Sequence, residues 1–396
     1  MRNFPQLREN TTIKHTGAIE PHGEENNSFS VKMKQTSNEG GEKEGLAIAE
    51  RKAVDALAVE LTSLGLSYVD SVNLWISMKS KPALLFCGPS GGFSDSLSSA
   101  ISHTLVGENS WQSQRFQGHP WWSEKSNNAG RLMMAQQRFT SIRLRSFLAE
   151  AAEAENSNQL FFALLIGISR AELQEYFVYL PRQIQTLGGI LELPFDISSD
   201  PTPYPENMYL IATINLDYEL ATELEVFDTC TLIYTEDLSS IKPDPILSEP
   251  VSPLSIQEIL NRRRRFTLVG SLETLSRLDG NYTQLGALTE IMTLLEMHNI
   301  QPRIGMVKDA YLFYANSWDA LGQGLFDENP SVNTHWVEDF WFQQSVIPRL
   351  LNRSLNDRAL RNDFLRLLTR NYPRSYRQLT RFLDRARVVT SVLQLD

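Results

Sequence analysis

Four short, continuous apolar segments constrain the fold of this chain more than any other feature of its sequence. They are Ala83–Cys87, Leu160–Ile166, Met208–Ile214 and Thr231–Tyr234. Continuous rather than alternating hydrophobicity predicts strands that are buried on both faces. Because helical patterns separate the segments, the sequence predicts an α/β fold in which a parallel sheet carries helices on both faces.

Apolar periodicity and end signals place the expected helices. In the first part of the chain they cover about 46–64, 68–78, a segment that starts near Ser94 or Asp95, 141–154 and 170–187. After a Pro-rich linker the chain is expected to be helical throughout: 256–265, 284–297, 305–316, 336–352, 356–370 and 373–389. This pattern divides the chain into a disordered polar tail (1–45), an α/β domain (46–242), the linker (243–254) and a helical domain (255–396).

The composition excludes several classes of protein. With 396 residues, the chain is long enough for two or three domains. No apolar run reaches the ~18 residues of a membrane span, and residues 1–45 are too polar for a signal peptide. Two cysteines, Cys87 and Cys230, cannot form a disulfide framework, which favours a reducing cytoplasm. Six scattered histidines add no zinc-binding spacing, so no metal site is predicted.

The net charge of −10 is unevenly distributed. Residues 1–250 carry a balance of −13 and residues 251–396 a balance of +3. An acidic body argues against broad DNA binding, because phosphate neutralisation needs clustered lysines and arginines. Residues 340–396 differ, with eleven arginines, no lysine and four aspartates. If the chain contacts a polyanion, this segment is the expected place.

The Gly-rich loop after the first apolar segment has the form of an anion cradle. A strand, such a loop and a helix N-terminus together direct backbone N–H groups and the helix dipole at a phosphate. Its candidate phosphate-binding residues are Gly88, Pro89, Ser90, Gly91, Ser94 and Asp95. The alternative is a tight strand-to-helix turn that Asp95 caps, because a negative charge there stabilises the helix but repels a phosphate.

Several segments together resemble McrB-type AAA+ NTPases, the motors of modified-DNA restriction systems. Phe86–Leu97 resembles the P-loop, Leu160–Phe177 the Walker B strand with its helix, and Asn207–Asp217 the sensor-1 strand. Gly118–Trp122, Phe227–Cys230 and Gln343–Leu350 match further segments in the same order. The resemblance implies an AAA+ P-loop-type α/β domain at 46–242 and an all-helical lid domain at 255–396.

The chain departs from this family at the residues that perform its chemistry. Ser94 and Asp95 stand where the P-loop has Lys and Ser/Thr, Ile166 and Gly167 where Walker B has Asp and Glu, and Thr229 where the arginine finger lies. Phosphoryl transfer depends on positioning and electrostatics, so the loss of the Lys, of both carboxylates and of the arginine finger implies no catalytic residues. Two sensor candidates remain, Asn215 and Arg303. The alternative for Asn215 is a polar residue that caps a strand end, and the alternative for Arg303 is a solvated charge at the start of a helix.

Four arginines near the end of the chain form the candidate partner-binding face. Arg374, Arg377, Arg381 and Arg385 have spacings of three and four residues, which place them on one side of a helix. Arg366 and Arg370 add an i,i+4 pair on the preceding helix. Arginine favours bidentate contacts with carboxylate or phosphate. A solvated helix face is the alternative.

These features predict a catalytically inactive AAA+-like subunit that acts as a scaffold or regulatory component of a multi-protein complex. The resemblance implies a bacterial anti-phage or mobile-element system and partners that include an active AAA+ paralogue. No cofactor is expected, and ATP or GTP binding is disfavoured. One alternative is a regulatory subunit that binds nucleotide without hydrolysis. Another is a nucleic-acid-binding adaptor that uses the C-terminal arginines. The expected location is cytoplasmic, without membrane contact.

Overall fold

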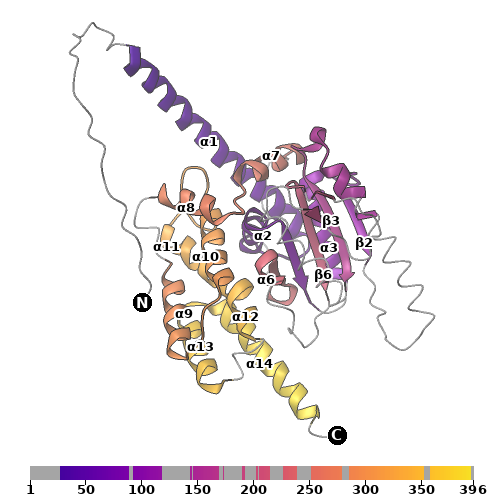
Figure 1. Cartoon of the computed structure of the whole chain (residues 1–396), viewed down its shortest axis with the longest axis vertical. Coiled ribbons are helices and arrows are strands. Elements are labelled where there is room, and N and C mark those ends of the chain that lie inside the picture. The colour runs from indigo at the N-terminus through magenta and orange to yellow at the C-terminus, as the bar shows by residue number, and fades with distance from the viewer. Residues whose placement is uncertain are drawn as a thin grey trace, which may run out of the picture. The chain divides into compact units, whose positions relative to one another are not determined.

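The structure is a computed structural model that describes most of the sheet and of the helical region (Figure 1). The described residues are 27–88, 92–117, 143–144, 146–168, 173, 190–191, 202–203, 205–214, 226–238, 251–278, 285–351 and 357–393. Their side chains are described except at 27–39, 190–191, 202–203, 237 and 386–393. Residues 44–396 form one compact unit.

The first helix, α1 (Asn27–Thr62), begins earlier than the apolar pattern predicts. Its N-terminal part, residues 27–45, coincides with the end of the predicted polar tail. The segment lacks an apolar stripe, and helix propensity does not account for it, because its Lys and Glu residues are interspersed with Gly, Ser and Asn. Within the compact unit, Ala53, Leu57 and Leu61 of this helix are buried, as expected from their spacing.

Five parallel strands form the sheet. They are β1 (Ala83–Cys87), β2 (Ser113–Gln117), β3 (Phe161–Ile168), β6 (Met208–Ile214) and β7 (Thr231–Tyr234). Their order across the sheet is β2-β3-β6-β1-β7, and every pairing is parallel. The first strand therefore lies between the last two, with Phe86 opposite Thr213 on one side and Ile233 on the other. A separate antiparallel pair joins β4 (Ile190–Leu191) to β5 (Thr202–Pro203).

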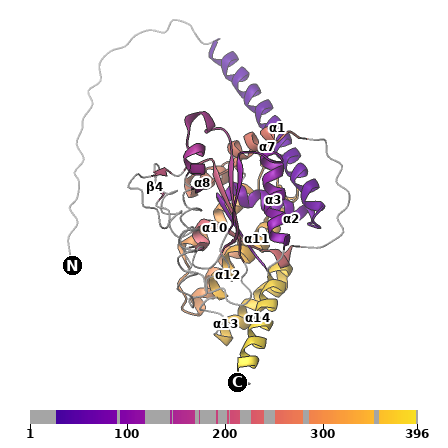
Figure 2. The ribbon, with the colours of Figure 1, turned by 90° about the vertical axis from the view of Figure 1, so that its right-hand side faces the viewer.

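Alternate residues of each central strand enter two different cores, which confirms the prediction of a sheet covered on both faces. In β1, Leu84 and Phe86 belong to one core, and Ala83, Leu85 and Cys87 to the other. The first core also contains side chains of α1, α2 (Tyr68–Ser80) and α3 (Gly92–Val106). Figure 2 shows these helices beside the sheet. The second core contains Phe147 and Leu148 from a helical segment and Phe227 from α6 (Val226–Thr229).

Helices make up most of the described C-terminal region, as predicted, but residues 317–329 are not helical and contain an isolated bridge between Trp318 and Gly324. Its helices are α7 (Pro253–Arg263), α8 (Leu268–Ser276), α9 (Gly286–Met297), α10 (Ile304–Asn316), α11 (Pro330–Trp341), α12 (Ile347–Leu351), α13 (Arg358–Asn371) and α14 (Pro373–Leu393). A π-helical turn, Phe342–Val346, joins α11 to α12, so the helix expected over 336–352 begins earlier and changes its winding midway. The expected helix at 170–187 lies outside the described residues, apart from residue 173.

Local capping explains where several of these helices begin. Ser67 and Asp70 form a capping box at the start of α2, where each side chain accepts a hydrogen bond from the other residue's backbone N–H. Ser252 caps α7, and Pro253 follows it at the first helical position. Asp357 caps α13. These polar residues satisfy N–H groups that have no partner inside their helix.

A buried ion-pair network joins the helical region to the sheet. Arg349 lies 2.9 Å from Asp309 and 2.7 Å from Asp228, and Lys81, just before β1, lies 2.7 Å from Asp309. The two carboxylates raise the pKa of Arg349 against the opposing effect of burial. Removing one partner of such a network leaves a buried charge uncompensated, so this junction is sensitive to single substitutions.

Candidate functional site

The carboxyl ends of β1 and β6 form the candidate site, because the chain leaves these neighbouring strands in opposite directions. After β1 it continues through α3 to β2, beyond β6, and after β6 it returns past β1 to β7. In parallel sheets a ligand crevice forms at such a switch point. The Gly88 N–H donates to the Ile214 carbonyl across 3.3 Å, which holds the two strand ends together.

Thr213 links three elements at this edge of the sheet. Its hydroxyl oxygen accepts a hydrogen bond of 2.8 Å from the Gly167 N–H and donates one of 3.2 Å to Asp95 Oδ1. Asp95 lies in the first turn of α3, where its negative charge interacts favourably with the helix dipole. The carboxylate therefore has a protein donor and a helix N-terminus as neighbours, the same groups that would otherwise serve a phosphate.

Gly167 has a backbone conformation that few other residues adopt. Its φ angle is +63°, and the pairing register of β3 shifts between Leu165 and Ile168. A β-carbon in this left-handed region meets the neighbouring carbonyl oxygen, so a side chain is strained there. The resemblance aligns this position with the water-orienting Glu of Walker B. The local backbone thus favours glycine at the point where the family carries a carboxylate.

Gly88, the first glycine of the loop, lies directly against Thr235. A β-carbon at this position would be 2.0 Å from Thr235 Oγ1, so no larger residue fits without movement. The Thr235 hydroxyl donates to the Cys87 carbonyl across 3.3 Å. This close approach explains the glycine by packing against the end of β7, without invoking a bound phosphate.

The remaining predicted residues of the loop are only partly described. Ser94 is buried, and its carbonyl accepts a hydrogen bond of 2.8 Å from Ser98 Oγ within α3. Phe93 is exposed beside it. Pro89, Ser90, Gly91 and the sensor candidate Asn215 lie outside the described residues.

The second sensor candidate, Arg303, stands at the N-cap position of α10. Its side chain is exposed and forms no ion pair with any residue that the structure describes. The other family position in this part of the chain, Thr229, is buried, and its hydroxyl donates to the Val226 carbonyl across 2.7 Å.

An open groove of about 700 Å³ adjoins the loop along α3. Its lining includes Gly92, Asp95, Ser96, Ser99 and His103 of α3 and Arg115 of β2. Arg115 Nη1 is 3.4 Å from Ser99 Oγ. The lining carries several serine hydroxyls, one positive charge at Arg115 and two carboxylates, Asp95 and Glu60. The groove has room for a polar small molecule.

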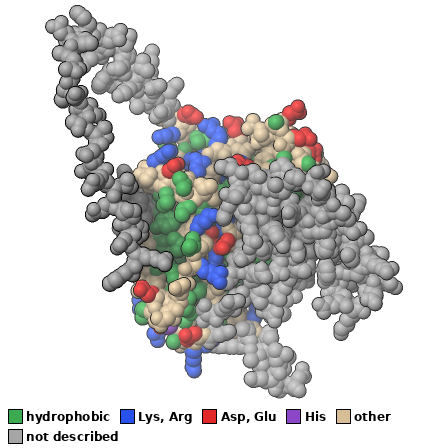
Figure 3. Space-filling view, viewed as in Figure 1, with side chains coloured by type: hydrophobic (Ala, Val, Ile, Leu, Met, Phe, Trp, Pro, Cys, Tyr) green, Lys and Arg blue, Asp and Glu red, His purple; other side chains and the backbone are tan. Residues whose placement is uncertain are grey.

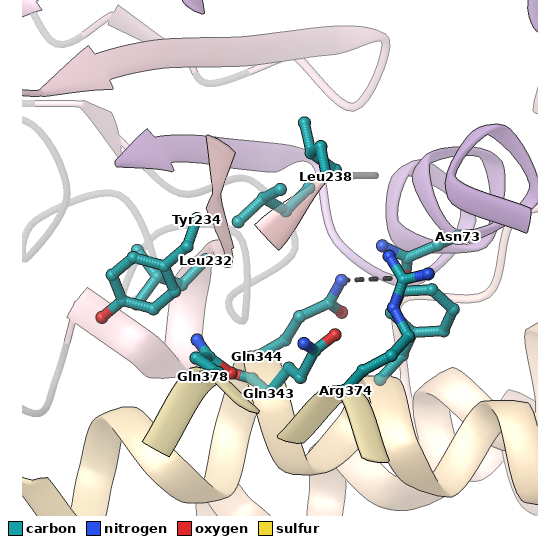
Figure 4. Close-up of a pocket in the computed structure, with 10 residues that line it drawn as sticks. Asn73, Leu232, Tyr234, Leu238, Gln343, Gln344, Arg374 and Gln378 are labelled. Carbon is teal, nitrogen blue, oxygen red and sulfur yellow. Dashed lines mark hydrogen bonds between the residues drawn. The ribbon is translucent and has the colours of Figure 1, made fainter. Parts of the chain in front are cut away.

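The predicted arginine face of α14 is divided by the structure. Arg374 is buried, forms an ion pair with Asp70 and lies over the Phe340 ring at 4.8 Å. Figure 4 shows it beside Asn73 and Gln344, which share a hydrogen bond of 2.8 Å. The prediction that Arg374 is available to a partner is therefore wrong, because the helix turns this residue into the core.

The other three arginines of this face have different surroundings. Arg381 and Arg385 both contact Glu236, at 3.3 Å and 2.5 Å. Arg377 is exposed, and its Nε donates to the Pro373 carbonyl of its own helix across 3.3 Å. Of the four predicted partner-binding residues, Arg377 alone is fully exposed without a carboxylate partner among the described residues.

Exposed arginines lie instead on α13. Leu360, Phe364 and Leu368 form its buried stripe, which turns Arg366 and Arg370 to solvent. The sequence contained this signal, because the apolar stripe has a spacing of four residues and fixes the opposite face as the exposed one.

Comparison with family models and with curated proteins identified no relative of this chain. No protein-family model matches the chain, and no curated protein matches it. The McrB-type resemblance thus depends on the chain's own residues and stays a prediction. Among the residues described, no group of three or more His, Cys, Asp and Glu side chains is placed to hold a metal ion. No helix in the described part of the chain is long and apolar enough to cross a membrane.

Proposed function

We propose that this chain is an AAA+-like subunit without hydrolytic activity that acts as a scaffold or regulatory component of a multi-protein complex. The bond from Thr213 to Asp95, together with the bond from Gly167 to Thr213, carries the proposal. These groups stand where a working NTPase of the resembled family needs open positions for magnesium, water and phosphate. In this chain the Gly167 N–H, the Thr213 hydroxyl and the Asp95 carboxylate form hydrogen bonds with one another instead.

The order of the strands supports the first half of the proposal. The Gly-rich loop follows a strand that lies next to the sensor-like strand β6, and the Walker-B-like strand β3 lies beyond it. Residues from three strands therefore converge on one edge, as phosphoryl transfer requires. Ile166 and Gly167 of β3 bring no carboxylate to the Walker B positions, and Asp95 of α3 brings a negative charge where the P-loop has a Ser/Thr hydroxyl.

The buried junction between sheet and helices supports the second half. Arg349, Asp309 and Lys81 hold the helical region on the sheet through buried ion pairs. A lid fixed in this way forms a constant surface for other subunits. From the resemblance, the proposed setting is a bacterial anti-phage or mobile-element system with an active AAA+ paralogue as partner.

The groove along α3 favours a second candidate, a regulatory subunit that binds nucleotide without hydrolysing it. Its volume and its position beside the loop suit a small polar ligand. Asp95 opposes this candidate, because its carboxylate would face a triphosphate without a compensating lysine.

Hydrolysis assays and melting curves of the purified full-length chain test both candidates. ATP and GTP turnover should remain at background, with or without DNA. Turnover that survives removal of contaminants and disappears in an Asn215→Ala variant would contradict the proposal. A ligand at about a thousand times its Kd stabilises a protein by ~4 kcal/mol. We expect no such shift with Mg-ATP or Mg-GTP, and a rise of several degrees would favour the nucleotide-binding candidate.

A further inference from the structure

A surface groove between α9 and α13 has the features of a docking site. Its volume is about 490 Å³. Leu294 and Leu367 are partly buried at its base, and Met297, with 73% of its surface exposed, stands at the rim. An apolar base open to solvent is a feature that binding sites share.

One wall of this groove is basic. Helix α13 contains four arginines and one aspartate, and Arg366 and Arg370 line the groove. The Arg366 side chain is 78% exposed. Figure 3 shows basic side chains at the lower edge of the molecule, where Figure 1 places α9 and α13. The wall is therefore accessible to a ligand in solution.

The single aspartate of this wall is engaged on both of its oxygens. Asp363 Oδ2 is 3.2 Å from His298 Nε2, and Oδ1 is 3.2 Å from Arg366 Nη1. Arg370 forms no ion pair with any described residue. The groove thus presents at least one guanidinium whose charge no described neighbour offsets, next to apolar side chains.

We propose that this α9–α13 groove binds an acidic segment of another protein. An apolar side chain of the segment packs on Met297 and Leu367, and its carboxylates pair with Arg370 and Arg366. The inference rests on the proposed function only in assuming that the chain works within a complex, for which it names a surface and the chemistry of the partner.

The lining of the groove favours a peptide over a nucleic acid. No aromatic residue lines it, whereas proteins that bind single strands stack bases on aromatic rings. Leu294, Met297 and Leu367 line it instead and offer apolar surface to a side chain of a peptide. Amphipathic helices insert apolar anchors at i, i+4 and i+7 spacing into grooves between helices, and arginines at the rim bind their carboxylates in a bidentate geometry.

Selection from a displayed library of random peptides of about 16 residues tests the inference, since that length spans such a groove as a helix. The target is the full-length chain. We expect the enriched peptides to combine acidic residues with large apolar ones. Synthetic copies of these peptides should bind the Arg370→Glu and Met297→Asp variants at least about tenfold more weakly than the wild type. The first change removes a charged contact with the peptide, and the second removes an apolar one. Both side chains are exposed, so neither change removes core volume.

Arg358→Glu is the matched control, because it reverses an exposed arginine of α13 that does not line the groove, and it should leave peptide affinity unchanged. No enrichment, peptides without acidic residues, or equal binding by all variants would overturn the inference. Binding of a short single-stranded oligonucleotide that Arg370→Glu abolishes would assign the wall to nucleic acid. A dimer in light scattering that Met297→Asp dissolves would assign the groove to a second copy. None of these outcomes alters the hydrolysis test of the proposed function.

Discussion

Arg381 and Glu236 form an ion pair of 3.3 Å that joins the last helix to the turn after β7. The ring of Phe382, the next residue, meets Tyr234 edge-on at a centroid distance of 4.8 Å. Thr235, between Tyr234 and Glu236, is the residue that covers Gly88. The C-terminal helix and the Gly-rich loop are thus connected through consecutive residues at the end of one strand.

Replacing Glu236 by Gln should loosen the C-terminal part of α14 without unfolding the protein. Arg381 and Arg385 both lose the charge of the Glu236 carboxylate, and partly exposed pairs of this kind contribute ~0.2–1 kcal/mol each. Hydrogen exchange over residues 376–393 should accelerate, while the melting temperature changes little. Glu258→Gln, which removes an exposed pair on α7, is the control and should leave exchange in α14 unchanged. Equal exchange in both variants would show that the aromatic contact alone holds the helix.

Four strands could be predicted from the sequence because a strand buried on both faces is apolar along its whole length. The fifth, β2, has the sequence Ser-Gln-Arg-Phe-Gln, in which Phe116 is the buried apolar side chain. Its neighbour in the sheet is β3 on one side only, so most of its side chains need not be apolar. Helix α8 was not predicted either, because three of its apolar residues, Leu268, Val269 and Leu272, are exposed.

The candidate site was less predictable, because its contacts join residues far apart in the chain. Helical spacing places Arg374 and Arg381 on one face, but it does not say that this face meets Asp70 and Glu236. The bridge from Thr213 to Asp95 spans 118 positions. The residues at the family's catalytic positions could be read directly from the sequence. The hydrogen bonds that now join some of these positions depend on how the chain folds.

Thr213→Val should destabilise the protein measurably. Valine has nearly the same shape, but it leaves the Gly167 N–H and the Asp95 carboxylate without the hydroxyl that links them. An unsatisfied buried polar group costs ~1–3 kcal/mol. Urea unfolding measures the loss. Thr104→Val is a suitable control, because among the described residues that hydroxyl bonds to the Ala100 carbonyl of its own helix alone, and its loss should cost ~0.5 kcal/mol or less. Equal losses of unfolding free energy in both variants would mean that the hydrogen bonds of Thr213 contribute no more to stability than that of Thr104.

Gly167→Ala should destabilise the chain by ~1–2 kcal/mol, since alanine at a φ of +63° brings its β-carbon against the backbone. Gly92→Ala provides the comparison, because its β-carbon would meet no atom within 4 Å and helix α3 begins there. Thermal melting of the two variants should differ by several degrees. If Gly167→Ala melts no lower than Gly92→Ala, the left-handed conformation is not required in solution.

Both cysteines should be unreactive in the folded protein. Cys87 and Cys230 are almost completely buried, and burial raises the pKa of the Cys87 thiol strongly and that of Cys230 to about 12. The thiolate is the reactive form, so a disulfide reagent at neutral pH should modify neither residue within minutes. The same reagent in denaturant should modify both. Rapid reaction of one thiol in the native state would indicate local opening of β1 or of the turn before β7.

Lys79 should make the stability of the protein depend on pH in the alkaline range. Its ammonium group is fully buried, 2.6 Å from Glu50 Oε1 and 2.7 Å from the Asn316 carbonyl oxygen. Burial lowers the pKa of Lys79 to about 8 from 10.5, although the Glu50 carboxylate acts in the opposite direction. Between these pH values the unfolded chain binds more protons than the folded one, so the contribution of Lys79 to the free energy of unfolding rises with pH. Below pH 8 the lysine is protonated in both states, and its contribution no longer changes.

Comparison of the wild type with Lys79→Met isolates this effect, because the other titrating groups are common to both proteins. The difference in unfolding free energy, wild type minus variant, should increase between pH 8 and 10.5, on a scale of ~1.4 kcal/mol for each unit of pKa shift that is realised. Urea unfolding at several pH values measures it. A difference that stays flat or decreases with pH would mean that Lys79 keeps its proton in the folded state, because its ion pair with Glu50 outweighs the cost of burial.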